Sequence, residues 1–164
     1  MPVERFPKKL SLYLETSAWN FVYADDAPEK RDATKAFFTE IRQGKYDIFI
    51  SGLVIVEIED APGQKRANLE VLIRELAPVQ LRRIKAVENL TNAYMEAKVG
   101  PEKAKPDMIH IAHAVAHNLD VVVSWNLKHI VRLKTKLLVN GINKSLGYKE
   151  IEIVTPEEVL GYGS

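Results

Sequence analysis

Short apolar runs of strand length alternate along this chain with longer segments of helical periodicity, which restricts the folds that it can adopt. Residues 10–14, 46–50 and 121–123 are apolar runs rich in aromatic, leucine or β-branched residues, the composition of buried strands. Weaker strand signals follow at 79–84 and at 151–154, where alternation indicates a half-buried edge strand. Strands separated by helices form parallel sheets, so we predict an α/β domain with a mainly parallel central sheet.

Proline, glycine and capping residues mark the ends of the predicted helices. We expect helices at 28–44, 53–59, 64–76, 86–98 and 108–118, and a shorter helix or turn from 127. Thr155-Pro156-Glu157-Glu158 has the pattern of a capping box with proline at the first helical position. With no repeat or linker in 164 residues, we expect an N-terminal tail at 1–9 and one domain at 10–164.

Composition excludes several classes of protein. The chain has no cysteine, which rules out disulfides, zinc thiolate sites and thiol nucleophiles and fits a reducing cytoplasm. Residues 1–9 lack the apolar stretch of a signal peptide, and no segment approaches the ~18 apolar residues of a membrane span. The net charge of +1 means that a nucleic acid would have to be bound by a local basic patch.

Four polar residues interrupt apolar runs or follow them: Glu15, Glu57, Asp107 and Asn126. Ligands bind at the carboxyl ends of parallel strands, so one cleft can collect all four. Clustered carboxylates are costly to desolvate and repel one another unless a cation neutralises them. Oxygen ligands without cysteine favour Mg²⁺ or Mn²⁺. Such an ion activates and orients water for attack on phosphorus, which is the chemistry of phosphodiester hydrolysis.

Four segments in order carry a family resemblance. They are LETSAWN at 14–20, SGLVIVEI at 51–58, DMIHIAHA at 107–114 and VSWN at 123–126. In sequence and spacing they resemble PIN-domain proteins, most of all the VapC-type ribonuclease toxins of toxin–antitoxin systems. The resemblance spans residues 10–154, nearly the whole chain.

This resemblance implies a single-domain three-layer α/β/α sandwich that acts as a metal-dependent endoribonuclease on RNA. It also implies a homodimer neutralised by a cognate antitoxin. The implied catalytic residues are Glu15, Glu57, Asp107 and Asn126, the first three as ligands of Mg²⁺ or Mn²⁺, with Ser17 and Ser124 as supporting hydroxyls.

Two departures from the family pattern favour an alternative function. Glu15 stands where the family has aspartate, which moves its carboxylate by about one bond length, and the neutral Asn126 stands at the position of a fourth acid. The alternative is therefore a catalytically weak or inactive PIN-like module that binds RNA or a protein. A small-molecule phosphatase is less favoured, because the chain has neither a glycine-rich phosphate loop nor an aspartate directly after the first strand.

Histidines and basic residues extend the candidate site. His110, His113 and His117 fall on one stripe at spacings of three and four, which zinc ligands on a helix can also have. The stripe lies opposite the apolar face of the helix, which favours a polar outer surface instead. His110 lies one turn from Asp107 and is a candidate supporting residue. A basic run follows Asn126, and we expect Lys128 and Arg132 to contact RNA phosphates unless the run is only a solvated face. Asn126 itself is either part of the site or an ordinary turn residue.

Overall fold

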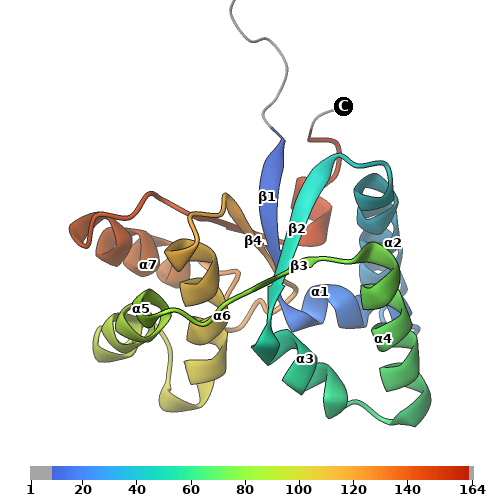
Figure 1. The fold of residues 1–164 in the computed structure, drawn as a ribbon, viewed down its shortest axis with the longest axis horizontal. Coiled ribbons are helices and arrows are strands. Elements are labelled where there is room, and N and C mark those ends of the chain that lie inside the picture. The colour runs from blue at the N-terminus through green and yellow to red at the C-terminus, as the bar shows by residue number, and fades with distance from the viewer. Residues whose placement is uncertain (1–8, 163–164) are drawn as a thin grey trace, which may run out of the picture.

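A five-stranded parallel sheet lies at the centre of residues 9–162, the part of the chain that the computed structural model describes (Figure 1). Its strands lie in the order β3-β2-β1-β4-β5. They are β1 (Leu10–Leu14), β2 (Tyr46–Ser51), β3 (Val79–Leu81), β4 (Val121–Val123) and β5 (Glu152–Val154). All four neighbouring pairs are parallel, as predicted. The expected tail, residues 1–9, lies outside the described residues except for Lys9.

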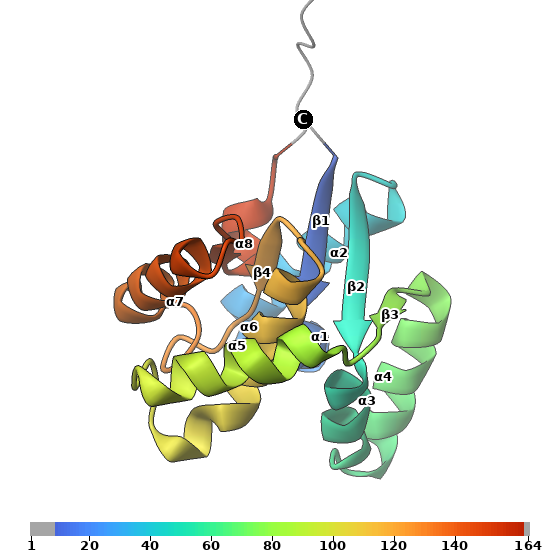
Figure 2. The ribbon, with the colours of Figure 1, turned by 60° about the vertical axis from the view of Figure 1, so that its left-hand side comes forward.

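Helices cover both faces of this sheet (Figures 1 and 2). In the described residues they are α1 (Thr16–Asn20), α2 (Pro28–Arg42), α3 (Gly52–Glu59), α4 (Gly63–Leu76), α5 (Lys85–Glu96), α6 (Lys105–Ala116), α7 (Leu133–Ser145) and α8 (Pro156–Val159), with 3-10 turns η1 (Phe21–Tyr23) and η2 (Glu102–Ala104). Helices α5, α6 and α7 lie on one side, and α2 and α4 on the other. The expected three-layer α/β/α sandwich is confirmed. Within residues 9–162 no helix is long and apolar enough to cross a membrane.

The predicted bounds differ most from the structure after β4. Residues 127–132 form a turn, one of the two expected possibilities, but a full helix of 13 residues, α7, then follows. The sequence of α7 has only a weak amphipathic pattern, since Leu133 and Leu137 are exposed while Thr135 and Asn143 are buried. Strand β3 is shorter than predicted and ends at Leu81. The capping box of Thr155 and Glu158 is present.

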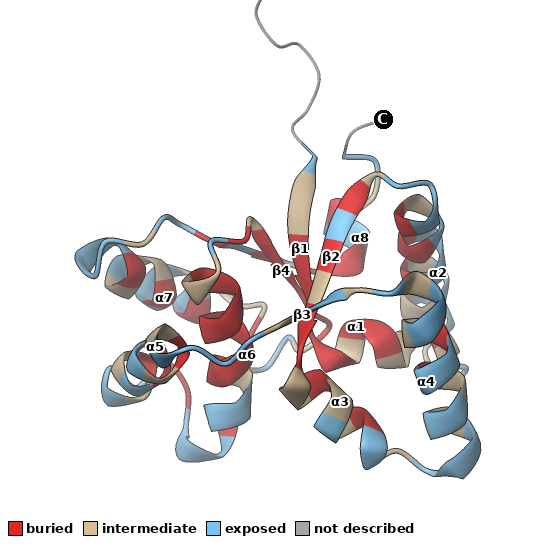
Figure 3. Cartoon of the chain, viewed as in Figure 1, coloured by how far each residue is buried: buried red, intermediate tan, exposed pale blue. Residues whose placement is uncertain are grey.

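The core lies against the two central strands, β1 and β4 (Figure 3). Leu12, Tyr13 and Leu14 of β1 are completely buried, and so are Val122 and Val123 of β4. Strands that are buried on both faces have continuous apolar sequences, which explains why these two were the clearest in the sequence. The burial also fixes the position of the residues that follow them.

The carboxyl ends of β1 and β4 form the switch point of the sheet. Connections from β1 lead through β2 to β3 on one side, whereas β4 and β5 extend the sheet on the other. Chain segments therefore separate above these two ends, which leaves room for a ligand. The backbone N–H of Glu15 donates to the carbonyl of Val123, which ties the two strand ends together. Glu15 and Asn126 both follow directly from this point.

Candidate active site

Glu15 occupies the step from β1 into α1. Its extended backbone places it at the N-cap of α1, where its carboxylate accepts a hydrogen bond from the N–H of Ser17 at 3.2 Å. The hydroxyls of Ser17 and Ser124 both donate to its Oε1, each at 2.6 Å. The side chain is buried, so these donors replace the water that it loses. Two strand ends thus hold one carboxylate in a single orientation.

Glu57 projects from α3 toward the same strand ends. Its Oε1 accepts from the Thr16 hydroxyl at 2.5 Å and lies 2.7 Å from Nε2 of His110. Burial acts to raise the pKa of Glu57, but the hydrogen bond and charge of His110 and the hydrogen bond of Thr16 outweigh it and lower that pKa below its usual value. The carboxylate is therefore kept ionised.

His110 links Glu57 to a buried chain of hydroxyls. Its Nδ1 lies 2.6 Å from the hydroxyl of Tyr13, which lies 2.8 Å from Oγ of Ser51. Nε2–H can donate to the Glu57 carboxylate, while Nδ1 faces the Tyr13 hydroxyl, a group that can both donate and accept. Burial raises the pKa of Tyr13 far above its usual value, so its hydroxyl stays protonated and can donate. The expectation that His110 stands beside the acids agrees with this geometry.

The predicted polar outer face of α6 is wrong. His110 and His113 are buried, and every residue from Met108 to Val115 has less than a tenth of its surface exposed. Helix α6 lies between the sheet and α5, so it has no wide solvent face, and the periodicity argument assumed one. His113 stacks on His117, and burial lowers its pKa to about 4.

Asp107 lies in the first turn of α6, half-buried beside the other two acids. Burial raises its pKa to about 6, and the negative charges of Glu15 and Glu57 add to the increase. The charge of His110 and a hydrogen bond from Asn126 act in the opposite direction without cancelling it. Asp107 therefore carries a charge that the protein compensates only in part.

Asn126 shapes the loop after β4 as well as contacting Asp107. Its N–H donates to Oγ of Ser124 at 2.9 Å, and its Oδ1 accepts from the N–H of His129 at 2.9 Å. The amide oxygen is thus engaged in a turn, and the amide nitrogen is the donor that remains for Asp107. The interpretation of Asn126 as a turn residue describes one of its two roles.

The arrangement fits a hard divalent cation. One ligand atom each from Glu15, Glu57 and His110 lie within 4.8 Å of one another, and Asp107 is close enough to the two glutamates for their charges to raise its pKa. Within residues 9–162 no lysine or arginine forms an ion pair with the carboxylate of Glu15, Glu57 or Asp107. Their oxygens are the ligands that Mg²⁺ and Mn²⁺ prefer.

Sequence reasoning missed part of the site. Thr16 follows Glu15 in the Glu-Thr-Ser motif, so its position in the sequence could have indicated a role in the site, where it contacts Glu57. Tyr13 and Ser51 had none, because they resemble ordinary strand residues in the sequence and meet His110 only in the folded sheet. Lys128 is exposed, while Arg132 is half-buried and contacts the backbone of a neighbouring loop.

Comparison with other proteins supports the fold alone. The sequence matches no protein-family profile and no curated protein. The structure matches a chain in the crystal structure of VapBC2 from Rickettsia felis bound to a DNA fragment from their promoter, with a TM-score of 0.54 and 13% identity. The match covers 89% of this chain and 98% of that one. The chain thus has a PIN-like α/β/α fold, which it shares with a chain of the VapBC2 structure.

Proposed function

We propose that this protein is a metal-dependent endoribonuclease, a hydrolase that cleaves RNA phosphodiester bonds. The observation that carries the proposal is the group of ligand atoms from Glu15, Glu57 and His110, which lie within 4.8 Å of one another at the carboxyl ends of β1 and β4. Asp107 lies close enough to this group for the charges of Glu15 and Glu57 to add to the rise of its pKa. Carboxylates gathered without a neighbouring lysine or arginine call for a bound cation. A cation among carboxylates at this edge of an α/β sheet suits phosphoryl chemistry.

Different residues of the chain have different roles in the proposed reaction. Glu15, Glu57 and Asp107 would hold Mg²⁺ or Mn²⁺, which when bound lowers the pKa of water and stabilises charge on the phosphate oxygens. Ser17 and Ser124 orient Glu15, and His110 orients Glu57. Asn126 assists by holding Asp107 through its amide.

The fold match supports a toxin of a type II toxin–antitoxin system. The VapBC2 structure contains a complex bound to promoter DNA, and by analogy we propose a cognate antitoxin as a partner of this chain. We propose RNA as the substrate, a homodimer as the assembly and, from the lack of cysteine, the cytoplasm as the compartment.

A cleavage assay with metal and chelator tests the proposed activity. Structured and unstructured RNAs are incubated with Mn²⁺ or Mg²⁺, with EDTA, and with the Asp107→Asn and Glu15→Gln variants. We expect cleavage only with metal, and a loss of at least about 100-fold in either variant, since even residues that only support metal ligands contribute 10- to 100-fold. Cleavage unchanged by both substitutions would exclude the proposed site.

The geometry of Asn126 favours one alternative, a PIN-like module that binds RNA or protein without cutting. Its amide oxygen already accepts a hydrogen bond from the N–H of His129, and this position supplies no negative charge. The tight group of ligand atoms also includes His110 but not Asp107. Binding of RNA or of an antitoxin, with no cleavage and no stabilisation by Mn²⁺, would support this alternative.

A further inference from the structure

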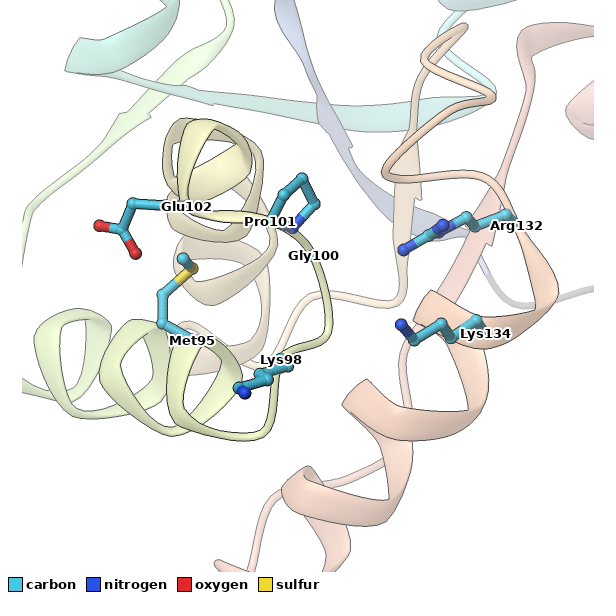
Figure 4. A pocket seen from close by; sticks show the side chains of 7 residues that line it. All are labelled: Met95, Lys98, Gly100, Pro101, Glu102, Arg132 and Lys134. Atoms are coloured by element: carbon cyan, nitrogen blue, oxygen red, sulfur yellow. The ribbon is translucent and has the colours of Figure 1, made fainter.

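A basic cleft lies between the loop that follows α5 and the start of α7 (Figure 4). Its volume is about 540 Å³. Lys98 and Glu102 lie on one side, and Arg132 and Lys134 on the other. Three cations against one anion make the cleft positive, although the whole chain has a net charge of only +1.

Arg132 joins the two walls of this cleft. Its Nη2 donates to the carbonyl of Val99 at 2.8 Å, and its Nε donates to the hydroxyl of Thr135 at 3.0 Å. These bonds leave the third nitrogen of the guanidinium with donors to spare. The cleft therefore has a fixed cation, Arg132, on the same wall as Lys134, and Lys98 on the opposite wall (Figure 4).

Each wall is connected through its own loop to a residue of the carboxylate site, Asn126 on one side and Asp107 on the other. The N–H groups of Ile130 and Val131 donate to the carbonyl of Asn126, so the loop folds back on Asn126. Arg132 is the next residue after Val131. On the other wall, Gly100 packs so closely that a Cβ there would lie 3.1 Å from Cβ of Ala104, the residue before α6. Asp107 lies three residues further on, so the cleft is anchored to the helix that carries it.

Lys98 occupies a backbone conformation in which glycine is usual. Its φ is +55°, just after the end of α5, where its N–H bonds to the carbonyl of Met95 and that of Val99 to the carbonyl of Tyr94. This conformation is energetically less favourable for lysine than for glycine, although the positive charge of lysine is favourable at a helix C-terminus. Binding of an anion at the cleft by the Lys98 side chain would explain why lysine, rather than glycine, occupies this position.

We infer that this cleft binds the phosphate backbone of a single-stranded RNA as it leaves the carboxylate site. The inference rests on the proposed function and names the path of its substrate. Cations without aromatic side chains line the cleft, so contact is to phosphates rather than to bases, and it is independent of sequence. Continuity with Asp107 and Asn126 favours RNA over an acidic protein segment, since a strand cut at the acids must pass along one of their loops.

The test measures binding in EDTA, so it does not depend on catalysis. The probe is a short fluorescent oligouridine, titrated with the full-length protein over a series of salt concentrations. The variants are Lys98→Gly, Lys134→Glu and the two combined, with Lys144→Glu at the far end of α7 as the matched control. Arg132 is left intact because its bonds hold the loops together.

We expect the double variant to raise Kd at least about tenfold. The slope of log K against log salt should fall by about 0.7 for each phosphate that the variant no longer neutralises. Lys98→Gly should weaken binding while raising the melting temperature, a combination that a purely structural role of Lys98 does not produce. Lys144→Glu should change Kd less than twofold.

Equal effects of the double variant and Lys144→Glu would overturn the inference. So would oligouridine binding that is unchanged in the double variant while binding of oligoglutamate is abolished, which would assign the cleft to an acidic protein. The proposed function fails separately: a wild type that binds oligouridine through the cleft but cuts no RNA with Mn²⁺ would retain this inference and exclude the nuclease.

Discussion

Two sides of the carboxylate site differ in how the protein treats its charge. Glu15 and Glu57 accept hydrogen bonds from hydroxyls and an imidazole, so the fold itself holds them in place. Asp107 lies beside them at the same strand ends, yet burial and its two acidic neighbours raise its pKa to about 6. The hydrogen bonds of the protein organise the first side, whereas on the second side they compensate the charge of Asp107 only in part.

This difference assigns different roles to similar residues. Glu15 and Glu57 are pre-oriented, and little reorganisation is needed when they bind a cation. Asp107 would gain most from the proposed cation, because the protein compensates its charge only in part. The following predictions, from the largest expected effect to the smallest, separate the pre-oriented side from the uncompensated one.

Replacing His110 should destabilise the pre-oriented side most. His110→Phe leaves the Tyr13 hydroxyl and Glu57 without their partner, and we expect a decrease of about 3 kcal/mol in the free energy of unfolding. Urea denaturation measures it. His113→Phe is the matched control on the same helix, because its buried Nδ1 has no partner within the described residues and its removal should cost little. Equal effects of the two would show that the His110 contacts do not hold Glu57.

Removing one serine hydroxyl should have a smaller effect. Ser124→Ala deletes a donor to Glu15 and the acceptor for the N–H of Asn126, and we expect about 2 kcal/mol of destabilisation and weaker metal binding. Ser145→Ala removes an exposed hydroxyl bonded only to its own helix and should be close to neutral. Unchanged Mn²⁺ affinity in Ser124→Ala, by calorimetric titration, would argue against orientation of Glu15 by this hydroxyl.

The pH dependence of stability should have opposite signs on the two sides. The pKa of Asp107 is higher in the folded protein than the ordinary 3.8, so the folded state holds its proton longer and stability falls as pH rises from about 4 through 6. The pKa of Glu57 is lowered, so its contribution is present above the ordinary 4.5 and disappears as pH falls.

Thermal unfolding in EDTA across this pH range measures both effects. We expect the difference between wild type and Asp107→Asn to change by on the order of 1 kcal/mol, because Asp107 is only partly buried. Glu57→Gln should give a difference of the opposite sign. Parallel curves for wild type and Asp107→Asn would mean that Asp107 is not the uncompensated acid.

Much of the fold could be predicted because its central strands are short, apolar and buried on both faces. Val121–Val123 was predicted to the residue, and the capping residues of Thr155 marked the last helix. Helix α7 was underestimated because its inner face carries Thr135 and Asn143, polar residues whose partners lie on other elements or on the preceding loop.

The sequence predicted that the acids lie at one edge of the sheet, because each interrupts or adjoins an apolar run; their role as a site stays a prediction. Their supporting contacts were not predictable, since Tyr13 and His110 are 97 positions apart and meet only through the packing of α6. The same holds for the basic cleft: Arg132 was visible as part of a charged run, but Lys98 lay far from it in the sequence.

The central claim is that a divalent cation completes the site at Asp107, and Mn²⁺-dependent melting tests it most directly. At a Mn²⁺ concentration of about 100 times Kd, binding should stabilise the wild type by about 2.7 kcal/mol. For a chain of this size that corresponds to roughly 5–10 °C in melting temperature. Asp107→Asn should show little of this increase. An equal increase in both proteins, or none in the wild type, would contradict the account.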